Sequence, residues 1–321
     1  MIWCRWFWLL CVLPGFAFGQ QTPTWPDRPI RVIVSGAAGG TADAIVRPVM
    51  AEVSKRLSQQ VVVENRPGAS GMIAAEAVAR ANADGYTYLA AFGSHIVNRI
   101  LQPKRPYSDS DLTGVSIFGR YAMLLAANKS LPNTPRGLLE YVRANPGALT
   151  FASGGDGTLS HLAGEMLAQR YAVKLTHVPY KGGNTAVPDL VAGRVGMMFD
   201  AVSTLGPHVR SEKLNAIAIS SSARTPLLPE VPTFAEAGFP EITAYAWTGL
   251  LTQSKAPPAI IERMSEVIVA ALNQAELRAL LTGSSFGMEL IGGTPAQANR
   301  FFDDEEARWG EVIRKGAIRA Q

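Results

Sequence analysis

The chain has 321 residues and a net charge of +4, from 30 basic and 26 acidic side chains. This charge is too small and too scattered for a nucleic-acid-binding surface, so we expect no nucleic-acid partner. The length is sufficient for two lobes, each with its own hydrophobic core.

The first 19 residues have the pattern of a secretory signal peptide. Arg5 precedes an apolar run over residues 6–12, and a Pro-Gly break follows that run. Ala17 and Gly19 are small residues at the two positions that a signal peptidase requires. We therefore expect residues 1–19 to be removed, a mature chain that starts at Gln20, and export to the periplasm.

Two other interpretations of this segment are less favourable. The apolar run is shorter than the ~20 residues that cross a bilayer, which disfavours an uncleaved anchor. Leu9 and Leu10, which precede Cys11, lack the small residue of a lipoprotein site. Both cysteines, Cys4 and Cys11, lie in the leader, so the 302-residue mature chain can have neither disulfides nor thiolate metal sites.

After the leader, short β-rich runs alternate with amphipathic helices, which is typical of α/β proteins with mostly parallel sheets. Strands are predicted at residues 30–34, 60–64 and 86–92, with helices over about 42–57 and 71–81. This is a βαβαβ arrangement, and right-handed crossovers place the C-terminal ends of its strands at one edge.

Residues 102–119 are less regular, contain Pro103 and Pro106, and are interpreted as a connection to a second lobe. Further strands are predicted at 149–153, 175–178, 195–199 and 216–220, and C-terminal helices at 260–271 and 298–313. Residues 247–252 are a candidate return crossing. The predicted division is lobe 1 over 20–126 plus 246–321, and lobe 2 over 127–245.

Two glycine-rich loops, Gly36–Asp43 and Ser153–His161, follow strands and precede helices. A helix N-terminus offers unpaired N–H groups and a partial positive charge, so such loops can bind anions without an arginine. One loop from each lobe could hold a ligand in an interlobe cleft. Similar turns are also common as purely structural features of α/β folds. A dinucleotide site is disfavoured, because Ser160 stands where its third glycine would be.

Catalytic and metal-binding patterns are weak. There is no Gly-x-Ser-x-Gly sequence of the hydrolase type. His95, His177 and His208 fall singly on different elements, and each is expected to be structural. The acidic run over residues 303–306 is expected to be a solvated helix face. We expect no catalytic residue, metal or cofactor.

The glycine-rich loops belong to a longer series of matching segments. The segments include Arg28–Arg31, Gly39–Asp43, Val62–Ala69, Ala83–Thr87, Phe151–Thr158, His161–Glu165, His177–Gly182, Leu228–Thr233, Glu236–Gly238 and Gly292–Pro295. In this order and spacing, the sequence resembles the Bug family, the periplasmic receptors of tripartite tricarboxylate transporters. The resemblance extends from Trp25 to about Gly316.

The resemblance implies a type II periplasmic-binding-protein fold, with two α/β lobes around a ligand cleft and crossing hinge strands. The implied ligand is a small carboxylate, bound by Gly39, Gly40, Thr41, Asp43, Gly93, Ser94, Gly155, Gly157, Thr158, Ser160, His161 and Asp200. One segment departs from the family, which usually has Pro-aromatic-Pro-Pro where this chain has Ser35-Gly36-Ala37-Ala38. Loss of the prolines loosens the first loop and loss of the aromatic residue opens space, so the family's ligand carries over to this chain less readily than its fold.

The expected function is capture of a small carboxylated metabolite by a monomeric receptor that delivers it to membrane permease subunits. Two alternatives stay open at this point. A receptor of the same fold could present its ligand to a sensor ectodomain, and a secreted hydrolase could act on a carboxylated substrate.

Overall fold

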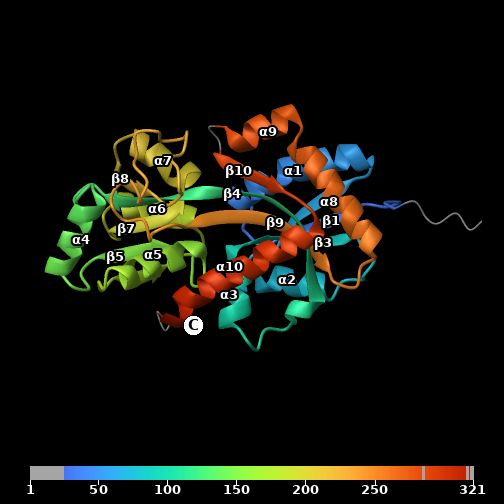
Figure 1. Cartoon of the computed structure of the whole chain (residues 1–321), viewed down its shortest axis with the longest axis horizontal. Coiled ribbons are helices and arrows are strands. Elements are labelled where there is room, and N and C mark those ends of the chain that lie inside the picture. Colours follow the sequence, from blue (N-terminus) through green and yellow to red (C-terminus); the bar gives the residue numbers. More distant parts are fainter. Residues whose placement is uncertain (1–24, 284–285, 316–317, 319–321) are drawn as a thin grey trace, which may run out of the picture.

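A computed structural model describes residues 25–283, 286–315 and 318. The predicted signal peptide and its cleavage site lie outside these residues. Ten strands form one continuous sheet, and helices pack against it along its whole length (Figure 1). No helix in the described part of the chain is long and apolar enough to cross a membrane.

The N-terminal part of the sheet is the predicted βαβαβ arrangement. Its elements are β1 (Ile30–Val34), α1 (Thr41–Leu57), β2 (Val61–Asn65), α2 (Met72–Ala79), β3 (Thr87–Phe92) and α3 (Gly93–Leu101). β1 pairs in parallel with both β2 and β3. The apolar positions of α1 recur at helical spacing and are buried, so α1 covers one face of these strands. The predicted strands and helices are confirmed to within two residues.

The middle of the chain repeats this arrangement. Its elements are α4 (Pro135–Ala144), β5 (Thr150–Ser153), α5 (Leu159–Arg170), β6 (Thr176–Pro179), α6 (Gly183–Val191), β7 (Met197–Ala201), α7 (Val202–Arg210) and β8 (Leu214–Ile219). β5 pairs in parallel with β6 and β7. All four strands predicted here are confirmed, with shifts of up to two residues.

Two antiparallel strands, β4 (Leu112–Asn128) and β9 (Tyr245–Gln253), connect the two parts. The strand order β2-β1-β3-β9-β4-β7-β5-β6 places this pair at the centre of the sheet. Figure 1 shows both strands running from one half of the molecule to the other. The predicted return crossing at 247–252 is therefore confirmed, as is the two-lobed fold.

The interpretation of residues 102–119 as irregular is wrong from Leu112 onward, where β4 begins. Thirteen of its 17 residues are buried and none is exposed, so the strand lacks the apolar–polar alternation that marks a half-exposed strand. The expectation of mostly parallel pairing is also too simple. β4 pairs antiparallel with β7, β8, β9 and β10, and β9 with β3.

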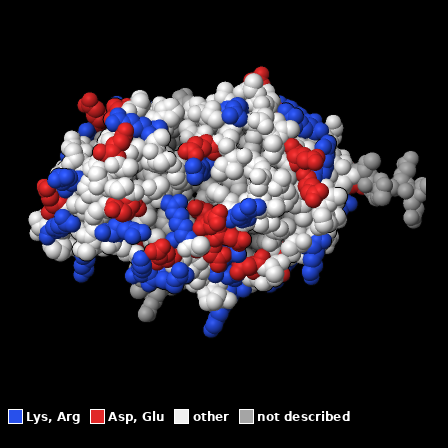
Figure 2. Space-filling view, viewed as in Figure 1, with Lys and Arg blue, Asp and Glu red and all other residues white. Residues whose placement is uncertain are grey.

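The C-terminal elements return to the first half. They are α8 (Pro258–Leu272), α9 (Ala275–Thr282), β10 (Met288–Gly292) and α10 (Pro295–Lys315). α10 packs against both α3 and α5, so it contacts both halves of the molecule. On the face that α10 crosses, acidic and basic side chains are interspersed (Figure 2).

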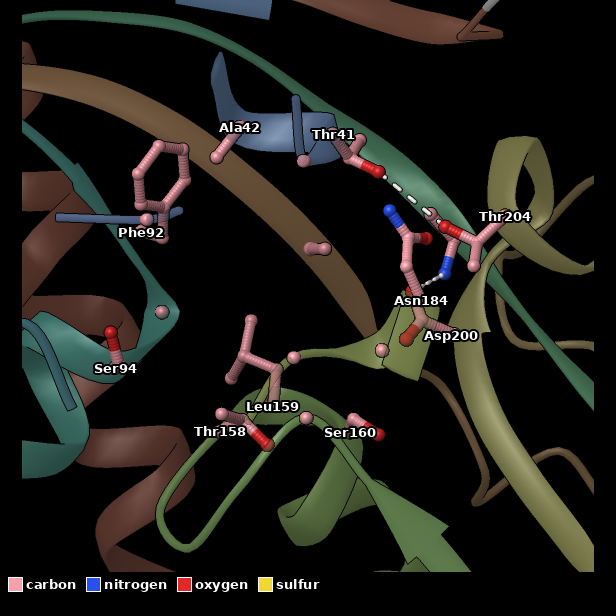
Figure 3. Close-up of a pocket in the computed structure, with 18 of the residues that line it drawn as sticks. Thr41, Ala42, Phe92, Ser94, Thr158, Leu159, Ser160, Asn184, Asp200 and Thr204 are labelled. Atoms are coloured by element: carbon pink, nitrogen blue, oxygen red, sulfur yellow. Dashed lines mark hydrogen bonds between the residues drawn. The ribbon is translucent and has the colours of Figure 1, made fainter. Parts of the chain in front are cut away.

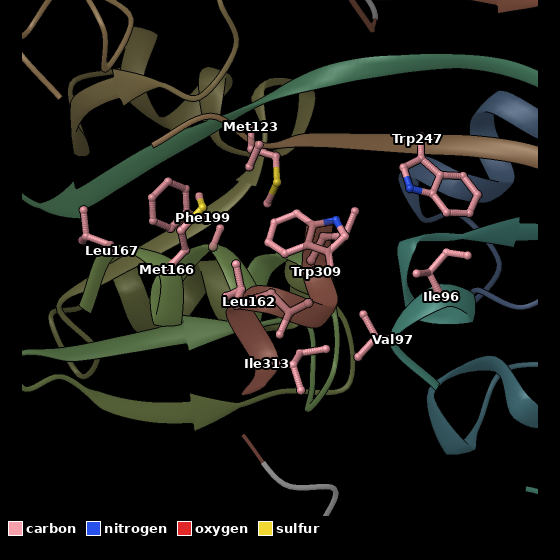
Figure 4. Packing of buried hydrophobic residues seen from close by; sticks show 14 of the residues in the cluster. Ile96, Val97, Met123, Leu162, Met166, Leu167, Phe199, Trp247, Trp309 and Ile313 are labelled. Atoms are coloured by element: carbon pink, nitrogen blue, oxygen red, sulfur yellow. The ribbon is translucent and has the colours of Figure 1, made fainter. Parts of the chain in front are cut away.

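A buried hydrophobic cluster, which includes Trp247 and Trp309, lies where α10 meets the crossing strands (Figure 4). The indole Nε1 atoms of Trp247 on β9 and Trp309 on α10 both donate to Oε2 of Glu305, each at 3.0 Å. The side chain of Glu305 is only 12% exposed. The interpretation of residues 303–306 as a solvated face is therefore wrong for Glu305, which provides the acceptor that two buried indoles require.

Candidate functional site

A cavity of about 380 Å³ lies between the two halves of the molecule, beside the crossing strands. Figure 3 shows side chains from both halves pointing toward it. Its wall includes Trp247 and Ala246 from β9 and Tyr121 and Met123 from β4. The strands that connect the halves thus form the back of the cavity.

Five helices begin at this cavity: α1, α3, α5, α6 and α7. The residues that line it include Thr41, Gly93, Leu159 and Gly183, which are the first residues of the first four, and Ala201, which precedes α7. The first N–H groups of a helix have no partner within the helix, and its dipole is positive at that end. Five such ends around one cavity favour a bound anion.

Seven of the twelve residues predicted to bind ligand line the cavity. They are Gly40, Thr41, Gly93, Ser94, Thr158, Ser160 and Asp200. The other five, Gly39, Asp43, Gly155, Gly157 and His161, lie outside the lining. These five residues belong instead to the hydrogen-bond networks that hold the two loops in shape. The networks differ between the two loops.

Asp43 stabilises the first loop from behind. Its carboxylate accepts hydrogen bonds from the backbone N–H of Gly39 at 3.0 Å, from Nε of Arg47 at 2.9 Å and from Nδ2 of Asn65 at 2.9 Å. Burial by itself would raise the pKa of Asp43, but these hydrogen bonds and the Arg47 charge outweigh it and lower the pKa. Asp43 is therefore an ionised group that fixes the loop.

Two stacked histidines stabilise the second loop. The rings of His161 and His177 lie 3.8 Å apart and nearly parallel, which corrects the expectation that His177 occurs singly. Nδ1 of His161 accepts from the N–H of Gly157 at 3.2 Å, and Nε2 of His177 lies 2.7 Å from Oγ of Ser153. Burial and the neighbouring His161 lower the pKa of His177 to about 4, so its ring is neutral near pH 7.

These histidines and Asp156 also place three potential metal-ligand atoms within 4.8 Å of one another. The stacking argues against a metal site. The nitrogen lone pairs of two parallel rings run side by side and do not converge on one ion. Gly157 and Ser153 already use one nitrogen on each ring.

Thr158 is the N-cap of α5 and also lines the cavity. Its Oγ1 accepts from the N–H of His161 at 3.4 Å and donates to the carbonyl of Gly155 at 2.7 Å. Ser160 lines the cavity too, but its hydroxyl donates to the carbonyl of Phe199 at 2.5 Å. Both hydroxyls thus have partners within the protein, and the loop mainly presents backbone N–H groups.

The sequence interpretation missed the start of α6. Lys181, Gly182, Gly183, Asn184 and Thr185 all line the cavity. No acidic group among the described residues lies within 4.0 Å of Nζ of Lys181, so this cation is available to a ligand. The signal was a glycine pair between a strand and a helix, which is the same pattern as in the two loops that were recognised.

Asp200, at the end of β7, is the acidic side chain that lines the cavity. Burial raises its pKa to about 6, against the opposing effect of hydrogen bonds from the Ala201 N–H and Thr204. The Ala201 N–H lies 2.6 Å from Oδ1. Thr204 in turn contacts Thr41 on α1, with 3.4 Å between the two hydroxyl oxygens.

The two halves also touch at the other rim of the cavity. Oγ of Ser70 donates to the carbonyl of Asp156 at 3.0 Å. The side chain of Leu159 lies directly over Gly93, in space that a Cβ atom there would take. The cavity is therefore bounded by contacts between the halves on two sides.

Comparison with known proteins agrees with this architecture. The sequence profile of the tripartite tricarboxylate transporter family receptors matches residues 45–318. BugT of Bordetella pertussis is 35% identical over 306 residues, 94% of this chain and 93% of its own length.

Two solved structures from Rhodopseudomonas palustris are similar along nearly their whole length. Rpa4515 with adipate has a TM-score of 0.85 and 32% identity, covering 92% of this chain and 99% of its own. MatC with bound malate has a TM-score of 0.81 and 32% identity, covering 90% of this chain and 99% of its own.

Proposed function

The chain belongs to the Bug family of receptors for tripartite tricarboxylate transporters, and from this membership we propose that its cavity captures a small carboxylate. The observation that supports this proposal best is the convergence of five helix N-termini on one cavity. Backbone N–H groups at helix starts bind carboxylates without a dedicated arginine.

The ligand class follows from the walls. Lys181 adds a positive charge, while Phe92, Leu159 and Trp247 add apolar surface. Relatives of this chain hold adipate and malate. A short dicarboxylate, or a carboxylate with one further polar group, fits this combination of charge and apolar surface.

The proposed receptor binds its ligand without changing it chemically. The cavity brings no serine and histidine together, because the Ser160 hydroxyl donates to Phe199 and the stacked histidines lie outside the lining. We assign no catalytic role to any described residue. Ser153 and His177 do lie 2.7 Å apart, with Asp156 3.5 Å from the other ring nitrogen. Ser153 is fully buried and outside the cavity lining, so this pair does not face a ligand in the cavity and the hydrolase alternative is disfavoured.

The lobes and the compartment are parts of the same proposal. Residues 20–126 with 246–321 form lobe 1, residues 127–245 form lobe 2, and β4 and β9 are the hinge between them. The protein acts in the periplasm as a monomer after removal of residues 1–19, and it delivers its ligand to membrane permease subunits. Intact-mass measurement of the exported protein tests this directly. A mass that corresponds to a chain beginning at Met1 contradicts the proposed cleavage and export.

A thermal-shift experiment tests the binding function. Exported protein is stripped of ligand by reversible unfolding and tested with succinate, malate, aspartate, adipate, benzoate, glucose and putrescine. A ligand at a hundred times its dissociation constant should stabilise the fold by about 2.7 kcal/mol. Lys181→Ala should reduce the shift with carboxylates, while Lys129→Ala, which changes an exposed lysine outside the cavity lining, should not. A shift with only glucose or putrescine contradicts the proposal.

A further inference from the structure

The cavity proposed for a carboxylate ligand has a carboxylate of its own. Asp200 lines it, and no lysine, arginine or histidine nitrogen of the described residues lies within 4.0 Å of its oxygens. Its hydrogen-bond donors are the Ala201 N–H and the Thr204 hydroxyl, both from the start of α7. A ligand carboxylate placed beside it would meet an uncompensated negative charge.

The surroundings of Asp200 are built to keep this side chain in place. Oδ2 lies against Gly183, at the position that a Cβ atom would need, so the start of α6 is shaped around the carboxylate. Burial of a carboxylate without an ion-pair partner is unfavourable for folding. Because Asp200 lies in the wall of the cavity, its carboxylate can contact a bound ligand.

Two more polar groups face the same region. Tyr121 on β4 and Asn184 on α6 line the cavity, and neither side chain has a hydrogen-bond partner among the described residues. Figure 3 shows Asn184, Asp200 and Thr204 gathered on one side of the cavity, with Phe92 and Ser94 opposite. One side thus offers a charged acceptor beside unpaired polar groups, and the other is more apolar.

A hydroxyl or ammonium group on the ligand would convert the repulsion into a charge-assisted hydrogen bond to Asp200. A plain carboxylate of the same length would leave Asp200 buried and without a partner. Sites that are built to bind a hydroxyl or amino group reject analogues that lack it much more strongly than apolar pockets reject a missing methylene.

We propose that Asp200 is a specificity-determining residue that selects carboxylates with a hydroxyl or protonated amino group over unsubstituted carboxylates of the same carbon skeleton. The inference rests on the proposed function, because it names the ligand class of that same site. In this arrangement, the helix N-termini and Lys181 bind the ligand carboxylate. Asp200 accepts a hydrogen bond from the hydroxyl or ammonium group of the ligand.

Calorimetric titration of matched ligand pairs tests the proposal. The pairs are succinate with malate, succinate with aspartate, and adipate with 2-aminoadipate, titrated into wild type, Asp200→Asn and Asp304→Asn. Asp304 is exposed and lies outside the cavity lining, so its variant controls for the loss of one negative charge. Wild type and Asp304→Asn should bind the substituted member of at least one pair ten times more tightly or better. In Asp200→Asn this preference should fall at least tenfold, through weaker binding of the substituted member and tighter binding of the plain one.

Each other outcome has a definite meaning. An equal preference in wild type and Asp200→Asn overturns the role of Asp200. Tighter binding of the plain member by wild type, with uptake of one proton in buffers of different ionisation enthalpy, also overturns it, because Asp200 would then bind as a neutral acid. If no carboxylate binds to wild type, the proposed function itself fails, and this inference fails with it.

Discussion

One carboxylate oxygen of Asp200 occupies the position that a Cβ atom on Gly183 would take. The two residues lie on different elements of lobe 2, at the end of β7 and the start of α6. Because Gly183 does not have the left-handed backbone conformation that favours glycine, this contact accounts for the need for glycine there.

Replacement of Gly183 by alanine should therefore destabilise the protein through this collision. We expect a loss of about 1–3 kcal/mol in the free energy of unfolding, typical of an overpacked site. The double variant Gly183→Ala/Asp200→Ala should recover most of the loss. Gly206→Ala in α7 is the control, because its Cβ would meet the flexible end of Arg210 at 3.3 Å and would otherwise make ordinary van der Waals contacts with Val202 and Leu228. Urea unfolding of wild type, these three variants and the single variant Asp200→Ala provides the free energies, and additive effects of the two substitutions in the double variant would contradict the contact.

The ligand-free protein should show a pH dependence that comes from Asp200. Its pKa is raised from 3.8 to about 6 in the folded state, so the folded state binds more protons than the unfolded state between these values. The contribution to stability is complete below about pH 4 and is lost as the pH rises through about 6. Asp200→Asn should match wild type near pH 4 and exceed it above pH 7, by on the order of 2 kcal/mol.

Thermal melts of both proteins between pH 4 and 8 measure this difference. The lowered pKa of His177 has the opposite effect, a loss of stability as the pH falls from 6.5 toward 4. That effect is common to both proteins and cancels in the comparison. Parallel pH profiles would show that folding does not raise the pKa of Asp200, and they would contradict this prediction.

Glu305 should be essential for the packing of the crossing strand against α10. Glu305→Ala would leave the indole N–H groups of Trp247 and Trp309 without their acceptor. Two unsatisfied buried donors correspond to a loss of about 2–4 kcal/mol in unfolding free energy. Glu305→Gln keeps an acceptor oxygen and should lose less.

Chemical unfolding followed by tryptophan fluorescence measures these losses. Asp304→Ala, at an exposed neighbouring position, should change the stability by less than about 0.5 kcal/mol. Equal losses for the alanine variants at 304 and 305 would contradict the role of Glu305.

Thr158→Ala should destabilise the N-terminus of α5, because Thr158 is its N-cap residue. Loss of the N-cap hydroxyl should lower the stability of ligand-free protein by about 1 kcal/mol, while Thr158→Ser should keep the cap and the stability. The same loop carries the first N–H groups of α5, so carboxylate binding should weaken in the alanine variant and return in the serine variant. Titration calorimetry with both variants checks this, and normal binding by Thr158→Ala would place the ligand away from this loop.

The sequence identified the elements of both lobes where periodicity was strong. Apolar residues of α1, such as Ile45 and Val49, recur at helical spacing and are buried as expected. β4 was missed because its residues are buried on both faces, so no alternation distinguishes a strand from irregular chain. The pairing of β4 with β9 depends on residues more than a hundred positions apart, which no local pattern reveals.

The candidate site was predictable to a similar extent. The glycine-rich pattern located the starts of α1 and α5, but it did not distinguish residues that face the cavity from those that shape the loop. Asp43 and His161 are polar residues at helix starts, yet their hydrogen-bond partners are Arg47 on α1, Asn65 at the end of β2 and Gly157 in the second loop. Trp247 lines the cavity because β9 pairs with the distant strand β4, and no local sequence pattern predicts this pairing.

Native mass spectrometry of freshly exported wild-type protein shows whether the cavity captures a carboxylate. We expect a population that carries one small molecule, which dissociates on activation and is identified by its mass as a carboxylic acid. Lys181→Ala should carry less of it, and Lys129→Ala the same amount as wild type. Wild-type protein that retains only a neutral or cationic molecule, or that stays empty after incubation with every carboxylate tested above, would contradict the account.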